Sequence, residues 1–227
     1  MKEIIEKAAK DIKKKLGKNL VSLYLVGTAA TSEKKIGDVD FFAIIKKVDF
    51  NENELNDVIT KKYSFPIRLR AVLYDEIYGK VDKGTDIMKY GIFDVPIFVK
   101  ILESGKLILG KRINFKKLPI KELNPKEYLL FEINKIKYSL ELLKQGKELP
   151  FRKEDFPKFV GYIVRAELFL RKKGFFLSYA EMSNQLKNES KHIIHDCVAI
   201  KHGKKKMSKD FLNKVEVYIK RMEKELK

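Results

Sequence analysis

Apolar and polar residues follow two different periods along the chain, and each change of period predicts a new element. In residues 4–16 apolar side chains recur every three or four positions, which predicts a helix that ends at Gly17. A mostly apolar run from Leu20 to Val26 then predicts a strand. Residues 38–45 predict a second strand. The chain therefore begins as a helix followed by two strands.

The next elements continue this mixed order. Asn51 to Glu54 has the pattern of a helix start, so residues 52–62 predict a helix, and residues 67–74 alternate as a third strand. Residues 101–110 predict the end of a helix, a glycine turn and a short strand. Strands and helices with few residues between them predict an α+β domain, in which helices flank a small mixed sheet.

After residue 112 the strand pattern disappears. Residues 113–123 are basic, contain proline and show no periodicity, so they predict a connector. Asn124, Pro125 and Glu127 then mark the start of a long helix that runs to about Gly146. Further helical segments are expected near 154–173, 178–187, 189–202 and 208–226. We therefore predict three parts: an α+β domain over 1–112, a connector over 113–123 and an all-α helical bundle over 124–227.

Two acidic residues mark the start of the second predicted strand. Side chains alternate along a strand, so Asp38 and Asp40 leave one face while Val39 and Phe41 point into the core. Two carboxylates this close repel each other unless a cation lies between them. A cluster of oxygen ligands suits Mg²⁺ or Mn²⁺, which complete their shells with water and substrate phosphates. The pair therefore predicts a metal site.

A glycine turn precedes this pair at a characteristic number of residues. Gly27 and Thr28 follow the first strand, and such a turn offers backbone N–H groups to a phosphate. Nine residues separate Thr28 from Asp38. This order resembles the signature of the DNA polymerase β-like nucleotidyltransferase superfamily, in which Gly and Ser or Gly precede the Asp pair. Thr28 departs from that pattern, because it keeps the hydroxyl and adds a methyl group.

The resemblance covers residues 1–112 and implies both an activity and roles for residues. It implies transfer of a nucleoside monophosphate from a nucleoside triphosphate such as ATP to a hydroxyl, with release of pyrophosphate. Asp38 and Asp40 would bind the metal ions, and Gly27 and Thr28 would hold the β and γ phosphates. Lys34 and Lys35 are weaker candidates for phosphate contact. The helical part is similar to the bundles of antibiotic nucleotidyltransferases and to the HEPN family.

The third strand departs from the family pattern. The family places a third carboxylate there, whereas this strand carries Arg68 and Arg70 on its polar side. Register favours Arg70 at the carboxylate position, with Arg68 as the alternative, and either guanidinium suits a triphosphate oxygen. Asp75 or Glu76 would supply the ligand only if the register slipped. Two hypotheses follow: an active nucleotidyltransferase, or an inactive nucleotide-binding or RNA-binding derivative of the same fold.

Composition sets the environment and the partners. The net charge of +18 favours anionic partners such as RNA, although only seven of the 49 basic residues are arginines and solvated lysines explain most of the excess. The single cysteine, Cys197, excludes an internal disulfide and favours a cytoplasmic setting. Without a long apolar run we expect no membrane span. The acceptor could be a small hydroxylated molecule, an RNA end or a protein tyrosine, and the sequence leaves the oligomeric state open.

Three further features lie in the helical part. A helical wheel places His192, His195 and His202 on one polar face, which would suit metal or phosphate, although a solvated or interdomain face is the simpler interpretation. Cys197 is expected in the core on the opposite side. The basic run 201–209, with Lys204, Lys205 and Lys206, is expected to line a cleft together with the connector and to attract an anionic acceptor.

Overall fold

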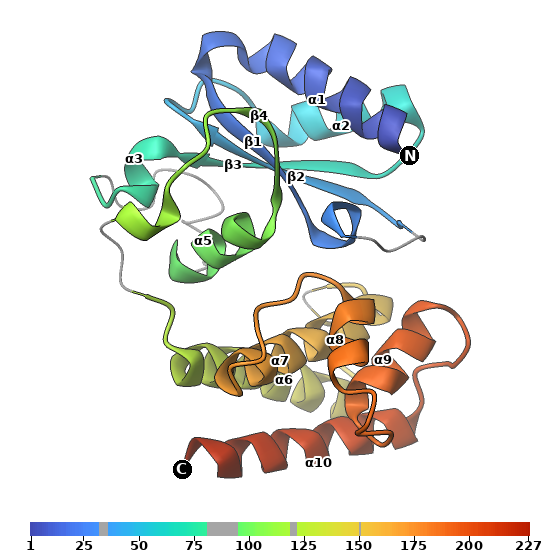
Figure 1. Cartoon of the computed structure of the whole chain (residues 1–227). Helices are drawn as coiled ribbons and strands as arrows, with labels where there is room; N and C mark the ends of the chain where they lie inside the picture. The colour runs from blue at the N-terminus through green and yellow to red at the C-terminus, as the bar shows by residue number, and fades with distance from the viewer. Residues whose placement is uncertain (32–35, 81–94, 119–121, 150) are drawn as a thin grey trace. The chain divides into compact units, whose positions relative to one another are not determined.

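The computed structural model describes residues 1–31, 36–80, 95–118, 122–149 and 151–227. The chain divides into two compact units, Met1–Glu122 and Leu123–Lys227 (Figure 1). Lys34 and Lys35, for which we expected phosphate contacts, lie outside the described residues. None of the described helices has both the length and the apolar character that crossing a membrane requires.

The first unit is built on a four-stranded mixed sheet. Its strands are β1 (Leu20–Val26), β2 (Val39–Ile45), β3 (Ile67–Leu73) and β4 (Lys106–Gly110), in the order β3-β2-β1-β4. β1 is antiparallel to β2 and to β4, whereas β2 and β3 are parallel. Helices α1 (Lys2–Leu16) and α2 (Glu52–Tyr63) and the short turns η1 (Gly17–Asn19) and η2 (Gly27–Ala30) come between or before the strands. The predicted α+β architecture is confirmed.

The two faces of the sheet are covered by different helices. The apolar faces of α1 and α2 share one buried core with the inward side chains of β1, β2 and β3, among them Leu25, Phe41 and Leu69. On the opposite face, Phe98 of α5 (Val95–Ser104) meets Phe42 edge to face at 4.9 Å. α3 (Tyr74–Ile77) follows β3, and η3 (Phe115–Lys117) lies near the end of this unit. Asp40 is on the α5 face, because its neighbours Val39 and Phe41 point to α1 and α2.

Polar side chains of α2 bind the outer edge of β3. They come from successive helical turns: Glu52, Asn56 and Thr60. Asn56 accepts from the Leu69 N–H at 2.5 Å and donates to the Leu69 carbonyl at 3.0 Å. Glu52 accepts from the N–H of Ala71. Thr60 donates to the carbonyl of Ile67 and accepts from its N–H. Edge-strand groups that would otherwise be open to another strand are therefore bonded within the chain.

The second unit is helical. Its elements are α6 (Pro125–Lys144), η4 (Lys153–Asp155), α7 (Phe156–Leu170), α8 (Tyr179–Gln185), α9 (Ile193–Lys201) and α10 (Lys209–Leu226). Asn124 caps α6 by accepting from the N–H groups of Lys126 and Glu127, as its sequence predicted. The predicted helical domain is confirmed, although α9 begins four residues later than expected. Ile113 and Leu118, in the stretch that we expected to be a connector, are buried and belong to the first unit.

Candidate functional site

The acidic pair lies at the beginning of β2. Asp38 immediately precedes the strand and Asp40 is its second residue, while Val39 and Phe41 are fully buried on the other face. Asp38 keeps one third of its side chain exposed to solvent. Asp40 therefore leaves the face opposite Val39 and Phe41, as the alternation predicted, and Asp38 lies directly before the strand.

The glycine turn lies beside this pair. Gly27 follows β1, and the antiparallel register pairs Val26, the residue before it, with Asp40. Gly27 has φ +68°, a left-handed conformation that favours glycine, and a Cβ built on it would touch Asp40 Oδ2 at 3.4 Å. The carbonyl of Thr28 accepts from both the N–H and the hydroxyl of Thr31, at 3.1 and 2.8 Å, which fixes the turn. The predicted turn and carboxylates thus meet at one corner of the sheet.

An arginine stands next to the pair on β3. The parallel register places Arg68 beside Asp40, and Arg68 Nη1 lies 3.9 Å from Asp38 Oδ2. Half of the Arg68 side chain is exposed, so water screens this ion pair and its net stabilisation is small. A cationic side chain therefore stands beside the acidic pair on the neighbouring strand.

The two arginines of β3 have separate partners. The sequence favoured Arg70, with Arg68 as the alternative, at the position where the resemblance expects a carboxylate, and in the structure it is Arg68 that pairs with Asp40. Arg70 pairs with Phe42 in the ladder and donates to Glu52 Oε1 at 2.8 Å. The register between the parallel strands β2 and β3 cannot be read from the local sequence of either strand. Arg68 is the arginine of this corner.

The two acidic residues after β3 lie at the opposite end of the sheet. Leu73 pairs with Ile45, at the far end of β2 from Asp40. Glu76 is buried and accepts from the N–H of Leu73 at 2.8 Å, and Asp75 is its neighbour in α3. The register slip that would bring either carboxylate beside Asp40 does not occur. Within the described ranges, no group of three or more His, Cys, Asp or Glu side chains is arranged to hold a metal ion.

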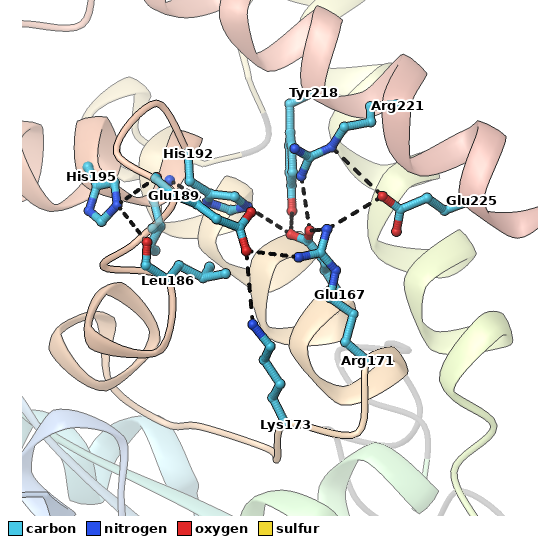
Figure 2. A network of polar contacts seen from close by, with 11 residues as sticks. Glu167, Arg171, Lys173, Leu186, Glu189, His192, His195, Tyr218, Arg221 and Glu225 are labelled. Atoms are coloured by element: carbon cyan, nitrogen blue, oxygen red, sulfur yellow. Dashed lines mark hydrogen bonds and ion pairs between the residues drawn. The ribbon is translucent and has the colours of Figure 1, made fainter.

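The three histidines of the second unit do not form the expected shared polar face. His192 precedes α9 in extended conformation, and its Nδ1 accepts from the N–H of Ile194, so it caps the helix instead of lying within it. It is buried, with Nε2 3.0 Å from Glu167. Nε2 of His195 faces the carbonyls of Leu186 and Glu189 at 3.2 and 3.1 Å (Figure 2). Both rings are therefore engaged in the fold.

Glu167 of α7 is the centre of a buried network that the sequence did not reveal (Figure 2). Its side chain is fully buried and receives four donors: His192, Tyr218, Arg171 and Arg221. Burial alone would raise the pKa of this carboxyl, but the hydrogen bonds and charges around it outweigh burial and lower the pKa. A single glutamate in an apolar helical segment gives no sequence signal for this role. Arg171 is local, four residues on, whereas His192 precedes α9 and Tyr218 and Arg221 belong to α10.

The remaining sequence candidates of this unit are mostly structural. Cys197 is buried as expected, and burial raises the pKa of its thiol, so the thiolate is disfavoured. In the basic run, Lys205 donates to Asp196 at 2.6 Å. One of its three central lysines is thus held in an ion pair.

The fold defines a class of protein. A mixed sheet with a glycine turn after β1 and an acidic pair at the start of β2, followed by a helical unit, is consistent with a nucleotidyltransferase fold. Among solved structures, the chain is similar to the spectinomycin adenyltransferase AAD(9) from Enterococcus faecialis, whose crystal structure contains ATP and spectinomycin. The two share 12% identity with a TM-score of 0.60, over 100% of this chain and 99% of that one. No family model and no curated protein matches the chain.

Proposed function

We propose that the protein is a metal-dependent nucleotidyltransferase that moves a nucleoside monophosphate from a nucleoside triphosphate to a hydroxyl acceptor and releases pyrophosphate. The observation that carries this proposal is the meeting of the Gly27 turn with Asp38 and Asp40 at one corner of a nucleotidyltransferase fold. The likeness to AAD(9) shows the fold, and ATP, which is bound in that structure, is the first nucleotide to test.

The donor set at this corner fits a divalent cation. Asp38 and Asp40 would hold Mg²⁺ or Mn²⁺, since both ions accept one or two carboxylates and take their other ligands from water and phosphate. When bound, such an ion neutralises charge on the triphosphate and on the leaving pyrophosphate. The glycine at position 27 leaves the space beside Asp40 free of a side chain, and the backbone of Gly27 and Thr28 would hold the β and γ phosphates.

Pyrophosphate release tests this proposal. The purified chain is given each nucleoside triphosphate with Mg²⁺ or Mn²⁺ and a panel of acceptors: small hydroxylated molecules, RNA ends and protein tyrosines. Asp38→Ala and Asp40→Ala should each lower the rate about 100-fold or more, because even residues that only hydrogen-bond to metal ligands are worth roughly 10-fold to 100-fold. Asp57→Ala, on the exposed side of α2, is the control. Metal-independent release, or release unchanged by either substitution, contradicts the proposal.

One observation favours the alternative, a catalytically inactive derivative that binds nucleotide or RNA. Arg68 occupies the strand position beside Asp40 where the resemblance expects a carboxylate, and its guanidinium would oppose a second cation there. It would still suit a triphosphate oxygen. Arg70, which already pairs with Glu52, is the weaker nucleotide contact of the two.

The substitution Arg68→Glu separates the two proposals. If Arg68 blocks chemistry, Arg68→Glu gains pyrophosphate release and binds more Mn²⁺ per chain than the wild type. If Arg68 serves a working site, the same substitution weakens triphosphate binding and lowers the rate. Arg68→Leu, which removes the positive charge without adding a carboxylate, serves as the matched control at the same position. A cytoplasmic setting, inferred from the single cysteine, and an RNA acceptor drawn to the basic surface are parts of the same proposal.

A further inference from the structure

The first unit contains a cavity that none of the roles above uses. It has a volume of about 460 Å³ and lies between the C-terminal end of α5, the strands β1 and β4, and residues 112–116. Pockets for small ligands typically measure about 300–1,000 Å³, so the cavity is large enough for a nucleoside. All of its lining residues belong to the first unit.

The cavity has an aromatic and aliphatic floor. Tyr24, Leu102 and Ile113 are buried there, and Leu107 and Phe115 are half-buried at its walls. The rings of Tyr24 and Phe115 are 5.9 Å apart, and the Tyr24 hydroxyl accepts from the N–H of Ile113 at 3.2 Å, which ties the 112–116 segment to β1. A half-buried aromatic wall above an apolar floor suits a flat heteroaromatic ring.

The rim of the cavity is positive. Arg112 and Lys116 are exposed at the rim, and among the described residues neither has a carboxylate partner. The acidic residue of the rim, Glu103, accepts from Lys100 at 2.7 Å, so its charge is already balanced. An anionic ligand is therefore favoured over a neutral one.

The cavity and the acidic pair lie on the same face of the sheet. Tyr24 is two residues before Val26, and Val26 pairs with Asp40, so the side chains of all three leave one face. Gly105, in the cavity wall, packs so closely on β1 that a Cβ there would lie 2.9 Å from the Leu25 carbonyl oxygen and 3.0 Å from Val26 Cγ1. The cavity wall thus touches the residue that precedes the Gly27 turn.

We propose that this cavity holds the nucleoside part of the nucleotide whose phosphates bind at the Gly27 turn. The inference rests on the proposed function and specifies it: the base stacks on Phe115, the apolar floor covers its edge, and Arg112 and Lys116 attract the phosphate side of the ligand. The Gly27 turn and the acidic pair recognise the phosphates alone, so the cavity supplies the contacts that tell ATP from inorganic tripolyphosphate.

Two probes test the proposal on the full chain: ATP and inorganic tripolyphosphate, each titrated with Mg²⁺ present. Leu107→Trp fills the cavity, and Phe115→Ala removes the stacking ring. We expect each to weaken ATP binding roughly tenfold, since a stacked base is worth about 1–3 kcal/mol, and to leave tripolyphosphate binding unchanged. Asp40→Ala should weaken both probes. Lys116→Ala should weaken ATP binding more than Lys117→Ala, its exposed neighbour outside the cavity.

The outcomes separate this inference from the function on which it rests. If the wild type binds both probes and the two cavity substitutions change neither affinity, or change both equally, the cavity is not the nucleoside site, while the phosphate site stands. If the wild type binds neither probe, the proposed function fails and this inference falls with it. Circular dichroism and the thermal midpoint of each variant show that it is folded, and Phe115→Leu, which keeps an apolar side chain, provides a milder second variant.

Discussion

Replacing Glu167 by alanine removes the acceptor that four side chains of the helical unit share. The donors lie at 2.6 Å (Tyr218 and Arg171), 2.9 Å (Arg221) and 3.0 Å (His192). Arg171 and Arg221 keep about a quarter and nearly half of their side chains exposed, so water replaces the lost acceptor for them. His192 and Tyr218 are buried and have no such replacement.

The size of the loss follows from those two buried donors. Leaving a buried donor unsatisfied costs about 1–3 kcal/mol, so two of them cost about 2–6 kcal/mol. This range agrees with the roughly 3–5 kcal/mol expected when one partner of a buried ion pair is removed. Domains are stable by only about 5–15 kcal/mol, so Glu167→Ala should unfold the helical unit under mild conditions.

Urea unfolding followed by circular dichroism measures this effect, because the chain has no tryptophan and the second unit is helical. The control is Glu141→Ala, which breaks an exposed pair with Lys144 and should cost less than about 1 kcal/mol. Should Glu167→Ala unfold at the same urea concentration as Glu141→Ala, the network would not be what holds α7, α9 and α10 together.

The carboxyl of Glu167 should also make the stability of the chain depend on pH. The pKa of Glu167 is lowered in the folded chain, so its contribution is complete above the unfolded pKa of about 4.3 and disappears as pH falls through the lower folded value. The difference in unfolding free energy between the wild type and Glu167→Gln should therefore shrink below about pH 4. A difference that grows on acidification would contradict the sign.

Three further predictions concern other parts of the chain. Asn56→Ala should cost about 1–2 kcal/mol, because both backbone groups of Leu69 lose their partner, whereas Asn53→Ala on the exposed side of α2 should cost almost nothing in the same urea assay. Gly161→Ala should destabilise the fold by about 1–3 kcal/mol, since its Cβ would lie 2.5 Å from the Tyr179 ring. A Tyr179→Leu background should relieve that cost. If the unfolding free energies of the two single variants add in the double variant, the clash is not the cause. Neutralising Lys204, Lys205 and Lys206 together should weaken single-stranded RNA binding and flatten its salt dependence, and unchanged binding at low salt would refute an RNA role for this run.

Most of the fold could be predicted from local sequence patterns. The helical spacing of Ile5 to Leu16 and the apolar run of β1 need only nearest-neighbour geometry, and the cap at Asn124 is a local hydrogen-bond pattern. The Gly27 turn and the acidic pair were predictable for a similar reason, since nine residues between two adjacent antiparallel strands keep both at one corner.

Features that depend on contacts distant in sequence were out of reach. Whether Arg68 or Arg70 stands beside Asp40 depends on the parallel register of β3, which no local pattern contains. His192 was placed on a helix face because the periodicity runs through it, whereas its ring caps the helix and binds a carboxylate 25 residues away. The cavity beside β4 is formed by elements that approach only in the fold.

The hydrogen bonds from α2 to the edge of β3 have a consequence for chemistry as well as for solubility. Neighbouring side chains of a strand face opposite ways, so a slip by one residue would turn Arg68 into the core and bring an apolar side chain to the acidic pair. Asn56, bonded to both backbone groups of Leu69, fixes the strand against such a slip from outside the sheet. The charge beside Asp38 and Asp40 thus depends on a helix that packs on the opposite face of the sheet, and mutations in α2 can alter the site without changing any residue in it.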